Sequence, residues 1–515
     1  MHAGGGGRAP SSGPRREPGR RGLIAVALAP GTALEDVAVS PLDPERLRAV
    51  LAPDALADFE HTLARGRELL ESRTFWNVNS TARGGGVAEM LRSLVAYARG
   101  AGADVRWAVI TPPPGIEEFF AVTKRIHNML HGYPGDGLGL GRAAREAYRA
   151  ALEPNALELQ ALVRPGDVVI LHDPQTAGLI SAMRAAGLSV IWRCHVGADA
   201  PNGEAHEVWD FLRPFVEQAD RYVFSRAAHV WEGLDPARTL IVPPSIDAFS
   251  AKNQDLSARQ VDAILKAAGA IAGTPGDAPT FTREDGSTGH VERAVQMLGV
   301  AAIDPTAPLV TQVSRWDMLK DPLGVIEGFV RHVLPAVPHA QLALVGPETA
   351  AVADDPEGAQ VLADCQEAWR AYPAAVRERV ALVCLPMTDL EENAALVNAI
   401  QRHSTVIVQK SLAEGFGLTV SEAMWKSRPV IASRVGGIVD QVVDGDSGVL
   451  VKDPADLREF GEAVSAILTS PAITARIAQR ARQRVADRFL ATRSLMQYAH
   501  ALTTLGPATA LPAVA

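Results

Sequence analysis

Two series of short apolar runs, each separated by longer amphipathic segments, constrain the fold of this chain most strongly. The runs are rich in β-branched residues and lie at 74–80, 105–111, 167–173, 188–195 and 221–225, then at 308–314, 340–346, 379–386, 404–411 and 429–437. Strands that alternate with helical segments are typical of parallel α/β sheets. We therefore expect an α/β protein with two Rossmann-like, doubly wound domains.

The periodic pattern stops between the two series, and this interruption sets the domain boundaries. We predict an N-terminal domain over 23–250, an interdomain segment with a flexible loop over 251–305, and a C-terminal domain over 306–485. A chain of 515 residues is also too long for one ordinary core. Two such domains would face a central cleft, where the carboxyl ends of the strands bind ligands.

The two ends of the chain carry separate predictions. Residues 1–22 are rich in Gly, Pro and Arg and are expected to form a disordered tail. An apolar stretch over 23–29 gives this end the outline of a secretory signal, but it is short and lacks a convincing cleavage site. A long last helix is expected over 471–504, with residues 486–505 packing back on the first domain.

Charge and cysteine content exclude several classes of protein. The formal charge is −9, and without a basic stripe this argues against nucleic acid as a partner. The three cysteines, Cys194, Cys365 and Cys384, are too few and too far apart for a disulfide framework or a zinc site. No apolar run reaches the roughly 18 residues of a membrane helix. A cytoplasmic location follows as the expectation.

The segment Glu414-Gly-Phe-Gly-Leu-Thr-Val-Ser-Glu422 is the strongest candidate for chemistry. Its glycines let a ligand approach the backbone, and amides of the helix beginning near Leu418 and Thr419 would point at an anion. Glu414 is free to accept hydrogen bonds from sugar hydroxyls. For Glu422 two interpretations stay open, because Thr419 and Glu422 also have the spacing of a helix capping box.

Two cations follow the first strand of the second domain. Arg315 and Lys320 lie at a strand end, where a doubly wound sheet binds phosphate. A single Arg or Lys in a loop is usually a solvated surface charge. Two cations facing the helix that begins near Leu418 suit a diphosphate leaving group, because charge that develops there must be neutralised.

A glycine turn over 84–86 lies between a predicted strand and a predicted helix of the first domain. Such a turn can hold phosphate oxygens or a donor sugar. The turn lacks the spacing of a P-loop, which disfavours a nucleoside triphosphatase. It also lacks the glycine fingerprint of a nicotinamide site, which disfavours a dehydrogenase.

His172, Asp173 and His195 end two strands of the first domain. Each histidine alone would be read as a packed or capping residue, but two on one sheet edge that faces Glu414 favour a functional role. No histidine pairing of metalloenzyme type is present, so no metal site is predicted. The pair Asp354-Asp355 is interpreted as surface charge.

Together these segments resemble glycosyltransferase family 4, a retaining family of the GT-B fold, and within it the trehalose synthases of the glycosyltransferring type and the trehalose phosphorylases. The resemblance runs from about residue 70 to 455. The stretches that carry it are 76–91, 117–132, 172–179, 192–199, 312–322 and 408–433.

The resemblance implies a role for each matching residue. Glu422 would hold the donor ribose, and Glu414 the hydroxyls of the transferred hexose. The hexose would also contact His195 and the backbone of Gly415, Phe416 and Gly417. The diphosphate would bind Arg315, Lys320, Gly85, Gly86 and the amides of Leu418 and Thr419. The acceptor would lie on the N-terminal domain, where Asp173, His172, Asp199 and the segment 117–132 are candidates.

The resemblance also implies the reaction. The expected activity is transfer of glucose from a nucleotide diphosphate glucose to glucose, with retention, to form α,α-trehalose. Trehalose phosphorylase, a transferase with another sugar acceptor, and a non-catalytic sugar-nucleotide sensor are the alternatives. No cofactor or metal is expected. The expected partners are small sugars, without nucleic acid or membrane, and a homodimer is a possible assembly.

Overall fold

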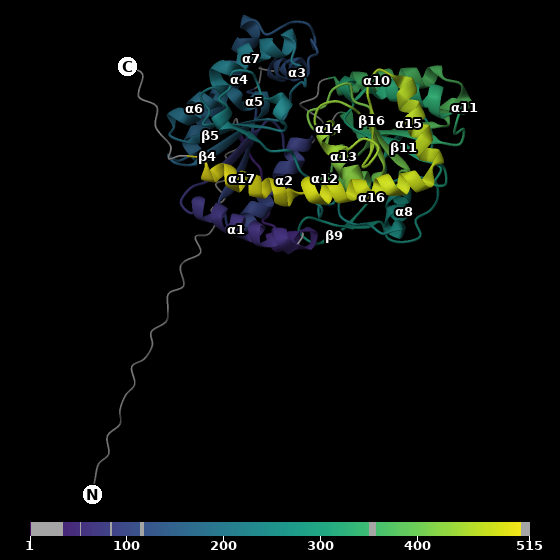
Figure 1. The fold of residues 1–515 in the computed structure, drawn as a ribbon, viewed down its shortest axis with the longest axis horizontal. Helices are drawn as coiled ribbons and strands as arrows, with labels where there is room; N and C mark the ends of the chain where they lie inside the picture. Colours follow the sequence, from purple (N-terminus) through teal and green to yellow (C-terminus); the bar gives the residue numbers. More distant parts are fainter. Residues whose placement is uncertain (2–33, 52, 83–84, 114–117, 350–356, 506–515) are drawn as a thin grey trace.

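The computed structural model describes residue 1 and residues 34–51, 53–82, 85–113, 118–349 and 357–505. Two lobes lie side by side, each built on a twisted sheet with helices on both faces (Figure 1). Two yellow C-terminal helices run across the lower part of both lobes. The tail predicted over 1–22 and the apolar stretch 23–29 lie outside the described residues, apart from Met1.

The first sheet has seven strands in the order β1-β3-β2-β4-β5-β6-β7, and all neighbours are parallel except β1 with β3. Its strands are β1 (Leu34–Asp36), β2 (Phe75–Asn79), β3 (Val105–Ile110), β4 (Val168–His172), β5 (Ser189–Cys194), β6 (Arg221–Phe224) and β7 (Thr239–Ile241). Its helices are α1 (Pro53–Leu69), α2 (Gly86–Gly100), α3 (Glu118–Leu130), α4 (Arg142–Leu162), α5 (Asp173–Thr176), α6 (Ile180–Ala185) and α7 (Gly203–Val216). Buried apolar clusters on both faces of the sheet form the core.

The second sheet also has seven strands, in the order β10-β13-β12-β11-β14-β15-β16, with β10 antiparallel at the edge. Its strands are β10 (Gln296–Leu298), β11 (Leu309–Val313), β12 (Gln341–Pro347), β13 (Val380–Leu385), β14 (Val406–Gln409), β15 (Val430–Ser433) and β16 (Val449–Val451). Its helices are α8 (Ala258–Ala267), α9 (Pro322–Gly328), α10 (Gly358–Ala371), α11 (Ala374–Arg377), α12 (Leu390–His403), α13 (Leu418–Trp425), α14 (Ile438–Gln441) and α15 (Leu457–Thr469). The predicted fold class, with two doubly wound domains, is confirmed.

Residues 251–305 differ from the predicted interdomain segment with a flexible loop. Helix α8 packs on α12, and β10 joins the second sheet. The stretch between them forms a hairpin of β8 (Thr280–Thr282) and β9 (Thr288–His290), and Phe281 is buried in the core that also contains residues of β12 and β13. The segment is therefore part of the second domain. Strands of three residues are too short to show a period in the sequence.

The single helix predicted over 471–504 is two helices, α16 (Pro471–Arg488) and α17 (Ala491–Thr503). Between them the chain pairs with Ile246, whose amide donates to the Phe489 carbonyl at 2.9 Å and whose carbonyl accepts from the Ala491 amide at 2.9 Å. This exchange interrupts the helical hydrogen bonds. Helix α17 then packs on α1 and α2 of the first domain, whereas α16 packs on α13 of the second (Figure 1).

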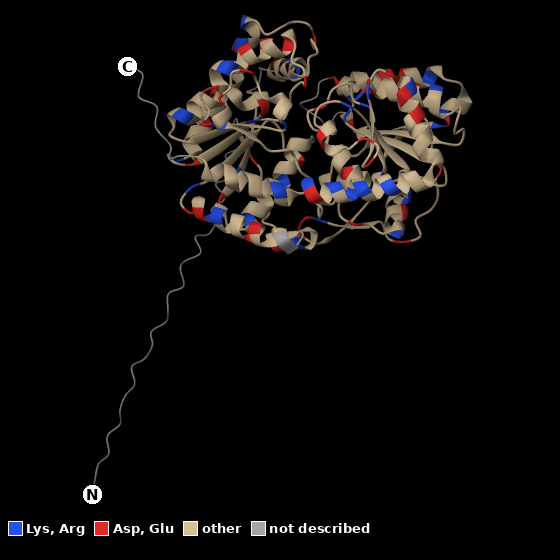
Figure 2. Ribbon diagram, in the orientation of Figure 1, with Lys and Arg blue, Asp and Glu red and all other residues tan. Residues whose placement is uncertain are grey.

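Basic and acidic side chains are interspersed over the outer helices, with a visible run of basic residues along α16 (Figure 2). Most of these arginines bind within the chain. Arg482 donates to the Trp425 carbonyl, Arg484 to the Gln441 and Asp440 carbonyls, and Arg476 to the Gly445 carbonyl. This run therefore attaches α16 to the second domain. None of the helices among the described residues is long and apolar enough to cross a membrane.

Candidate active site

The carboxyl ends of the two sheets face each other across a cleft with a cavity of about 360 Å³. The cleft collects almost all the predicted site residues. Those that line it are Gly85, Gly86, His172, Asp173, His195, Arg315, Lys320, Glu414, Gly415, Phe416, Gly417, Leu418, Thr419 and Glu422. Gly84 lies outside the described residues.

Glu414 follows β14 and is paired with the predicted cation Lys320. The Lys320 Nζ lies 2.7 Å from Glu414 Oε2, and Ser411 Oγ donates to the same oxygen at 3.3 Å. The expectation that Glu414 is free therefore needs correction, because one oxygen is already engaged. The ion pair joins the β11 loop to the β14 loop and brings a cation and an acceptor to one point of the cleft.

The glycines beside Glu414 let this loop touch the first domain. A Cβ on Gly415 would lie 2.5 Å from the His195 carbonyl oxygen. On the other side the Gly437 amide donates to the Gly415 carbonyl at 3.1 Å. The loop is enclosed between the two domains, and at Gly415 only a residue without a side chain fits this gap.

Helix α13 begins at Leu418, with Gly417 as its N-cap at φ 83° and no side chain capping the first turn. The amides of Leu418 and Thr419 at this terminus lie beside the cleft, where a helix attracts an anion. Thr419 is inside the helix and is not its N-cap, so the capping-box interpretation of Glu422 is wrong. Glu422 Oε1 instead lies 3.7 Å from Lys252 Nζ.

A buried aspartate in the loop after β11 organises the cations on this same wall. Asp317 Oδ2 lies 3.8 Å from Arg315 Nη2 and 3.0 Å from Nζ of Lys124, which belongs to α3 of the first domain. Burial would raise the pKa of Asp317, but Lys124, Lys320 and Arg315 outweigh burial and hold it far below its usual value. Asp317 is therefore ionised and gathers positive charge at the cleft.

His195 is held at both ring nitrogens. Its Nδ1 lies 3.0 Å from Asp173 Oδ2, and its Nε2 accepts a hydrogen bond from Arg193 Nε at 2.5 Å. Burial lowers the pKa of His195 against the opposing effect of Asp173, and Arg193 lowers it further. The ring is thus neutral, and it is held in a fixed orientation at the wall of the cleft.

His172 stacks on His195, with ring centroids 5.6 Å apart and an angle of 8° between the rings. Its Nε2 lies 3.3 Å from Asn77 Oδ1, and burial, followed by His195 and Arg193, lowers its pKa well below the usual value. Asp173 adopts φ 66°, which is rare for a residue other than glycine and is found at functional sites. Both residues line the cleft where the prediction put them.

Asp199 lies outside the cleft lining and is the predicted acceptor residue that the structure does not support. Its carboxylate accepts from Arg226 Nη1 at 2.6 Å and from the Gly436 amide at 3.2 Å, and it lies 3.4 Å from His229 Nε2. Arg226 also reaches Asp440 of the second domain at 3.1 Å. Asp199 therefore takes part in an interdomain contact. It lies several residues beyond the end of β5, where the chain has already turned toward the second domain.

Several residues of the cleft lining were not singled out from the sequence, and four of them form two contacting pairs. Lys252 and Glu89 contact each other through Nζ and Oε1, and His127 and His131 lie in contact with ring centroids 4.9 Å apart. The histidines fall in the predicted acceptor segment 117–132. Lys252 had no sequence signal, since it lies in a linker without a motif.

No group of three His, Cys, Asp or Glu side chains that could hold a metal ion occurs within the described ranges. The pair Asp354-Asp355 lies outside them. The three cysteines are buried and unpaired.

Comparison with known proteins gives the family. Residues 77–231 match the model for the trehalose synthase N-terminal domain, and residues 390–484 match the model for group 1 glycosyl transferases. A trehalose synthase of Pyrococcus horikoshii is 38% identical over 443 residues, which cover 85% of this chain and 92% of that protein. A trehalose phosphorylase of Pleurotus pulmonarius is 26% identical and covers 79% of this chain and 54% of its own.

The fold agrees with solved structures of the GT-B type. An α,α-trehalose-phosphate synthase (UDP-forming) from Burkholderia vietnamiensis superimposes with a TM-score of 0.62 at 16% identity, covering 84% of this chain and 99% of that one. This likeness concerns the fold alone. The identity with the archaeal relative along nearly its whole length shows that the chain is a glycosyltransferase of GT-B fold that belongs to the trehalose synthase family.

Proposed function

We propose that the protein transfers glucose from a nucleoside diphosphate glucose to a second glucose, with retention of configuration, and so forms α,α-trehalose. The observation that carries the proposal is the set of cationic groups on one side of the cleft. Arg315, Lys320 and the uncapped start of α13 surround a space that is bounded by Gly85 and Gly86 on the other domain. Such a set suits a diphosphate that gains charge as it leaves.

The sugar ring would lie beside Glu414 and His195. Glu414 is oriented by Lys320 and Ser411, so that it can accept hydrogen bonds from hexose hydroxyls. Both imidazole nitrogens of His195 are engaged by other residues. His195 would therefore support the sugar ring through contact and through its carbonyl. We assign the acceptor to the wall formed by His127, His131, His172 and Asp173. The names of the relatives, trehalose synthase, support glucose as the acceptor.

The proposed step balances without a protein base. The bond from C1 of glucose to the β-phosphate oxygen breaks, and a bond from C1 to the acceptor hydroxyl forms on the same face. The hydroxyl proton passes to the leaving phosphate oxygen, while Arg315 and Lys320 hold the diphosphate. We propose that no metal or cofactor is required, because these cations and the helix terminus neutralise the charge.

The test is a two-armed assay of the purified full chain. One arm contains UDP-, ADP- or GDP-glucose with glucose, and the other contains trehalose with phosphate. Equal amounts of trehalose and nucleoside diphosphate in the first arm are the expected result. Lys320→Met should abolish that product, whereas Lys266→Met, a lysine paired with Asp262 on α8, should not.

Two outcomes would overturn the proposal. Glucose 1-phosphate formed only in the phosphate arm would make the protein a phosphorylase, the activity named for the Pleurotus relative. Hydrolysis of the nucleotide sugar in the first arm without formation of trehalose, together with no glucose 1-phosphate in the second arm, would retain the donor and replace the acceptor.

A further inference from the structure

Glu89, Lys252 and Glu422 form a charged bridge across the two domains. Lys252 Nζ contacts Glu89 Oε1 on α2 of the first domain and lies 3.7 Å from Glu422 Oε1 on α13 of the second. All three residues line both the main cleft and an adjoining cavity of about 540 Å³. The bridge therefore stands at the wall between two ligand-sized spaces, beside the start of α13.

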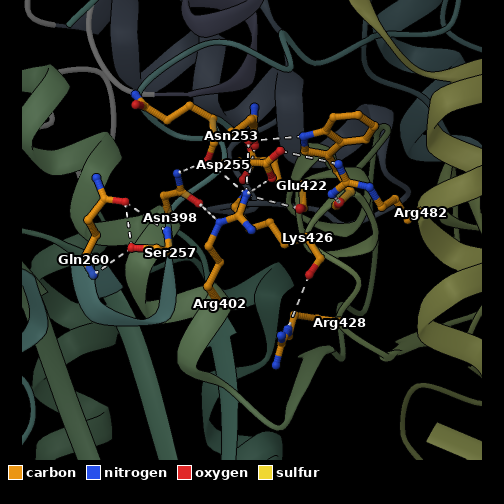
Figure 3. Close-up of polar contacts among 12 residues, drawn as sticks. Asn253, Asp255, Ser257, Gln260, Asn398, Arg402, Glu422, Lys426, Arg428 and Arg482 are labelled. Carbon is orange, nitrogen blue, oxygen red and sulfur yellow. Dashed lines mark hydrogen bonds and ion pairs between the residues drawn. The ribbon is translucent and has the colours of Figure 1, made fainter. Parts of the chain in front are cut away.

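The backbone on each side of Lys252 is fixed by buried polar contacts. The Ala251 carbonyl accepts from Asn398 Nδ2 of α12 at 3.1 Å. Asn253 accepts from Trp425 Nε1 at 3.1 Å through its carbonyl and from Lys426 Nζ at 2.9 Å through its side chain (Figure 3). Ala251 is thus attached to α12, and Asn253 to the C-terminal end of α13. These two helices flank β14 and the loop 410–417 that contains Glu414, which we call the donor loop. The Lys252 side chain points away from these contacts and into the cleft.

The two contacts of Lys252 are unequal. Its contact with Glu89 is direct, whereas 3.7 Å to Glu422 exceeds a hydrogen-bond distance. Glu422 is 5% exposed in its side chain, so its charge needs a nearby cation. Lys252 supplies that charge and leaves the hydrogen-bonding capacity of Glu422 for a ligand. Glu89 keeps the ammonium from closing onto Glu422.

The ionisation of the bridge agrees with this arrangement. Burial lowers the pKa of Lys252, but Glu422 and Glu89 outweigh burial and leave it above the usual value. Burial raises the pKa of Glu89 against the opposing effect of Lys252, and Glu422 raises it further. Lys426 on the far side of Glu422 has its pKa lowered to about 7 by burial, against the effect of Glu422. The constant positive charge beside Glu422 is therefore that of Lys252.

We propose that Lys252, restrained by Glu89, is a positioning residue that holds Glu422 available to the ribose diol of a nucleoside diphosphate donor. The inference rests on the proposed function, since it requires a donor with a ribose. It assigns a role to Lys252, which lies outside the motif segments, and to Glu89, which lies in the stretch 76–91 but had no predicted role. It also places recognition of the ribose at the junction of both domains, so that the ribose site is complete only when the domains meet.

The test compares two ligands of the purified full chain by calorimetry: the preferred diphosphate among UDP, ADP and GDP, and inorganic pyrophosphate, which has no ribose. Lys252→Met leaves Glu89 and Glu422 as neighbouring like charges. We expect the nucleotide to bind about tenfold more weakly and pyrophosphate to bind as in the wild type. The KM for the nucleotide sugar should rise by a similar factor with a smaller change in kcat.

A double variant separates positioning from folding. Glu89→Gln alone lets Lys252 close onto Glu422 and should weaken nucleotide binding several-fold. Lys252→Met combined with Glu89→Gln removes the repulsion and should recover part of the loss, which a disrupted fold would not do. Lys252→Arg should keep most of the affinity, and Lys266→Met is the matched control on α8. If Lys252→Met does not fold, Glu89→Gln and Lys252→Arg carry the test.

Three results would overturn the inference. Equal losses for nucleotide and pyrophosphate would make Lys252 a phosphate-binding cation. A double variant no better than Lys252→Met would remove the role of Glu89. Unchanged nucleotide binding in every variant would leave the bridge without influence on Glu422. If the wild type binds pyrophosphate but none of the nucleotides, the donor is not a nucleoside diphosphate sugar. That result would refute the proposed function.

Discussion

Arg193 donates the hydrogen of its Nε to Nε2 of His195 at 2.5 Å, and this contact determines which tautomer the histidine adopts. Because Nε2 accepts, the proton lies on Nδ1, which faces Asp173 Oδ2 at 3.0 Å. A neutral imidazole thus separates a buried guanidinium from a carboxylate at the edge of the first sheet. Arg193 has no exposed surface, and its other contacts are the Val242 carbonyl at 3.0 Å and the ring of Tyr498 at 5.3 Å.

Replacing Arg193 by Met should separate activity from stability. A buried charge without a directly bonded carboxylate adds little to the fold, so the melting temperature should change by only a few degrees. His195 loses its fixed tautomer, and we expect kcat for glucosyl transfer to fall at least about tenfold. Arg184, which is paired with Asp220 at 2.8 Å far from the cleft, provides the control. Arg184→Met should lower stability and leave kcat unchanged.

The buried His131 predicts a loss of stability in acid. Burial, followed by Lys320 and His229, lowers its pKa in the fold to about 3, from 6.5 in an unfolded chain. Between these values the unfolded state binds more protons, so stability is fully present above pH 6.5 and decreases as the pH falls. Near pH 5.5 the contribution of His131 should approach about 1.4 kcal/mol per pH unit.

Urea unfolding of His131→Asn and of the wild type between pH 8.5 and 5 measures this contribution. The variant should show a smaller decrease below pH 6.5, by about 1 kcal/mol per pH unit. Above pH 7.5 neither state binds this proton, so the two slopes should coincide whatever the variant does to absolute stability. Parallel curves over the whole range would contradict the prediction.

The alternation of apolar runs was enough to predict both sheets, because β2 to β6 and β11 to β15 are buried strands flanked by helices. The strands not predicted, β1, β7, β8, β9, β10 and β16, have three residues each and show no period. The capping-box interpretation placed the N-cap of α13 at Thr419, two residues after the observed N-cap Gly417, since either residue can precede a helix. Only the φ of Gly417 distinguishes them.

Sequence motifs were enough to predict the site residues that they contain. Residues that only tertiary contacts bring into the site were missed. Arg315, Lys320, Glu414 and Glu422 stand at fixed spacings after strands, and parallel sheets bring such positions to one edge. Lys252 is different. Lys252 contacts Glu89, which lies 163 positions away in the sequence, and no local sequence pattern indicates this contact. Asp199 shows the reverse error, since a position past a strand end does not determine which domain a side chain faces.

The Lys320–Glu414 pair should respond differently to one substitution and to two. Lys320→Met leaves the Glu414 carboxylate, 11% exposed, without its cation, and we expect about 2 kcal/mol of lost stability. Adding Glu414→Gln removes the unpaired charge and should restore the stability measured by urea unfolding. The transfer rate should stay at least about a hundredfold below wild type in both, because the leaving group lacks its cation. Recovery of the rate in the double variant would show that Lys320 serves only to hold Glu414.

Two cleft glycines on opposite domains provide a matched comparison of how closely the domains meet. A Cβ on Gly415 would lie 2.5 Å from the backbone oxygen of His195, which has little freedom to move because its own amide donates to Asp173 at 2.7 Å. A Cβ on Gly86 would lie 2.8 Å from the Cδ1 of Leu418, the end of a flexible side chain. The same added methyl group therefore meets a rigid neighbour in one case and a yielding one in the other.

Gly415→Ala should lower kcat by about a hundredfold, since a displacement near 1 Å of the donor loop misaligns the reacting groups. Gly86→Ala should change kcat less than about threefold, because Leu418 can adopt another rotamer. Steady-state kinetics with the donor sugar at saturation measure both, and urea unfolding verifies that both variants are folded. Equal losses would mean that the glycine turn limits the reaction as strongly as the donor loop does. A large loss for Gly415→Ala alone would show that catalysis depends on the contact between the two domains. The contact responsible would be the one between the His195 carbonyl and the donor loop.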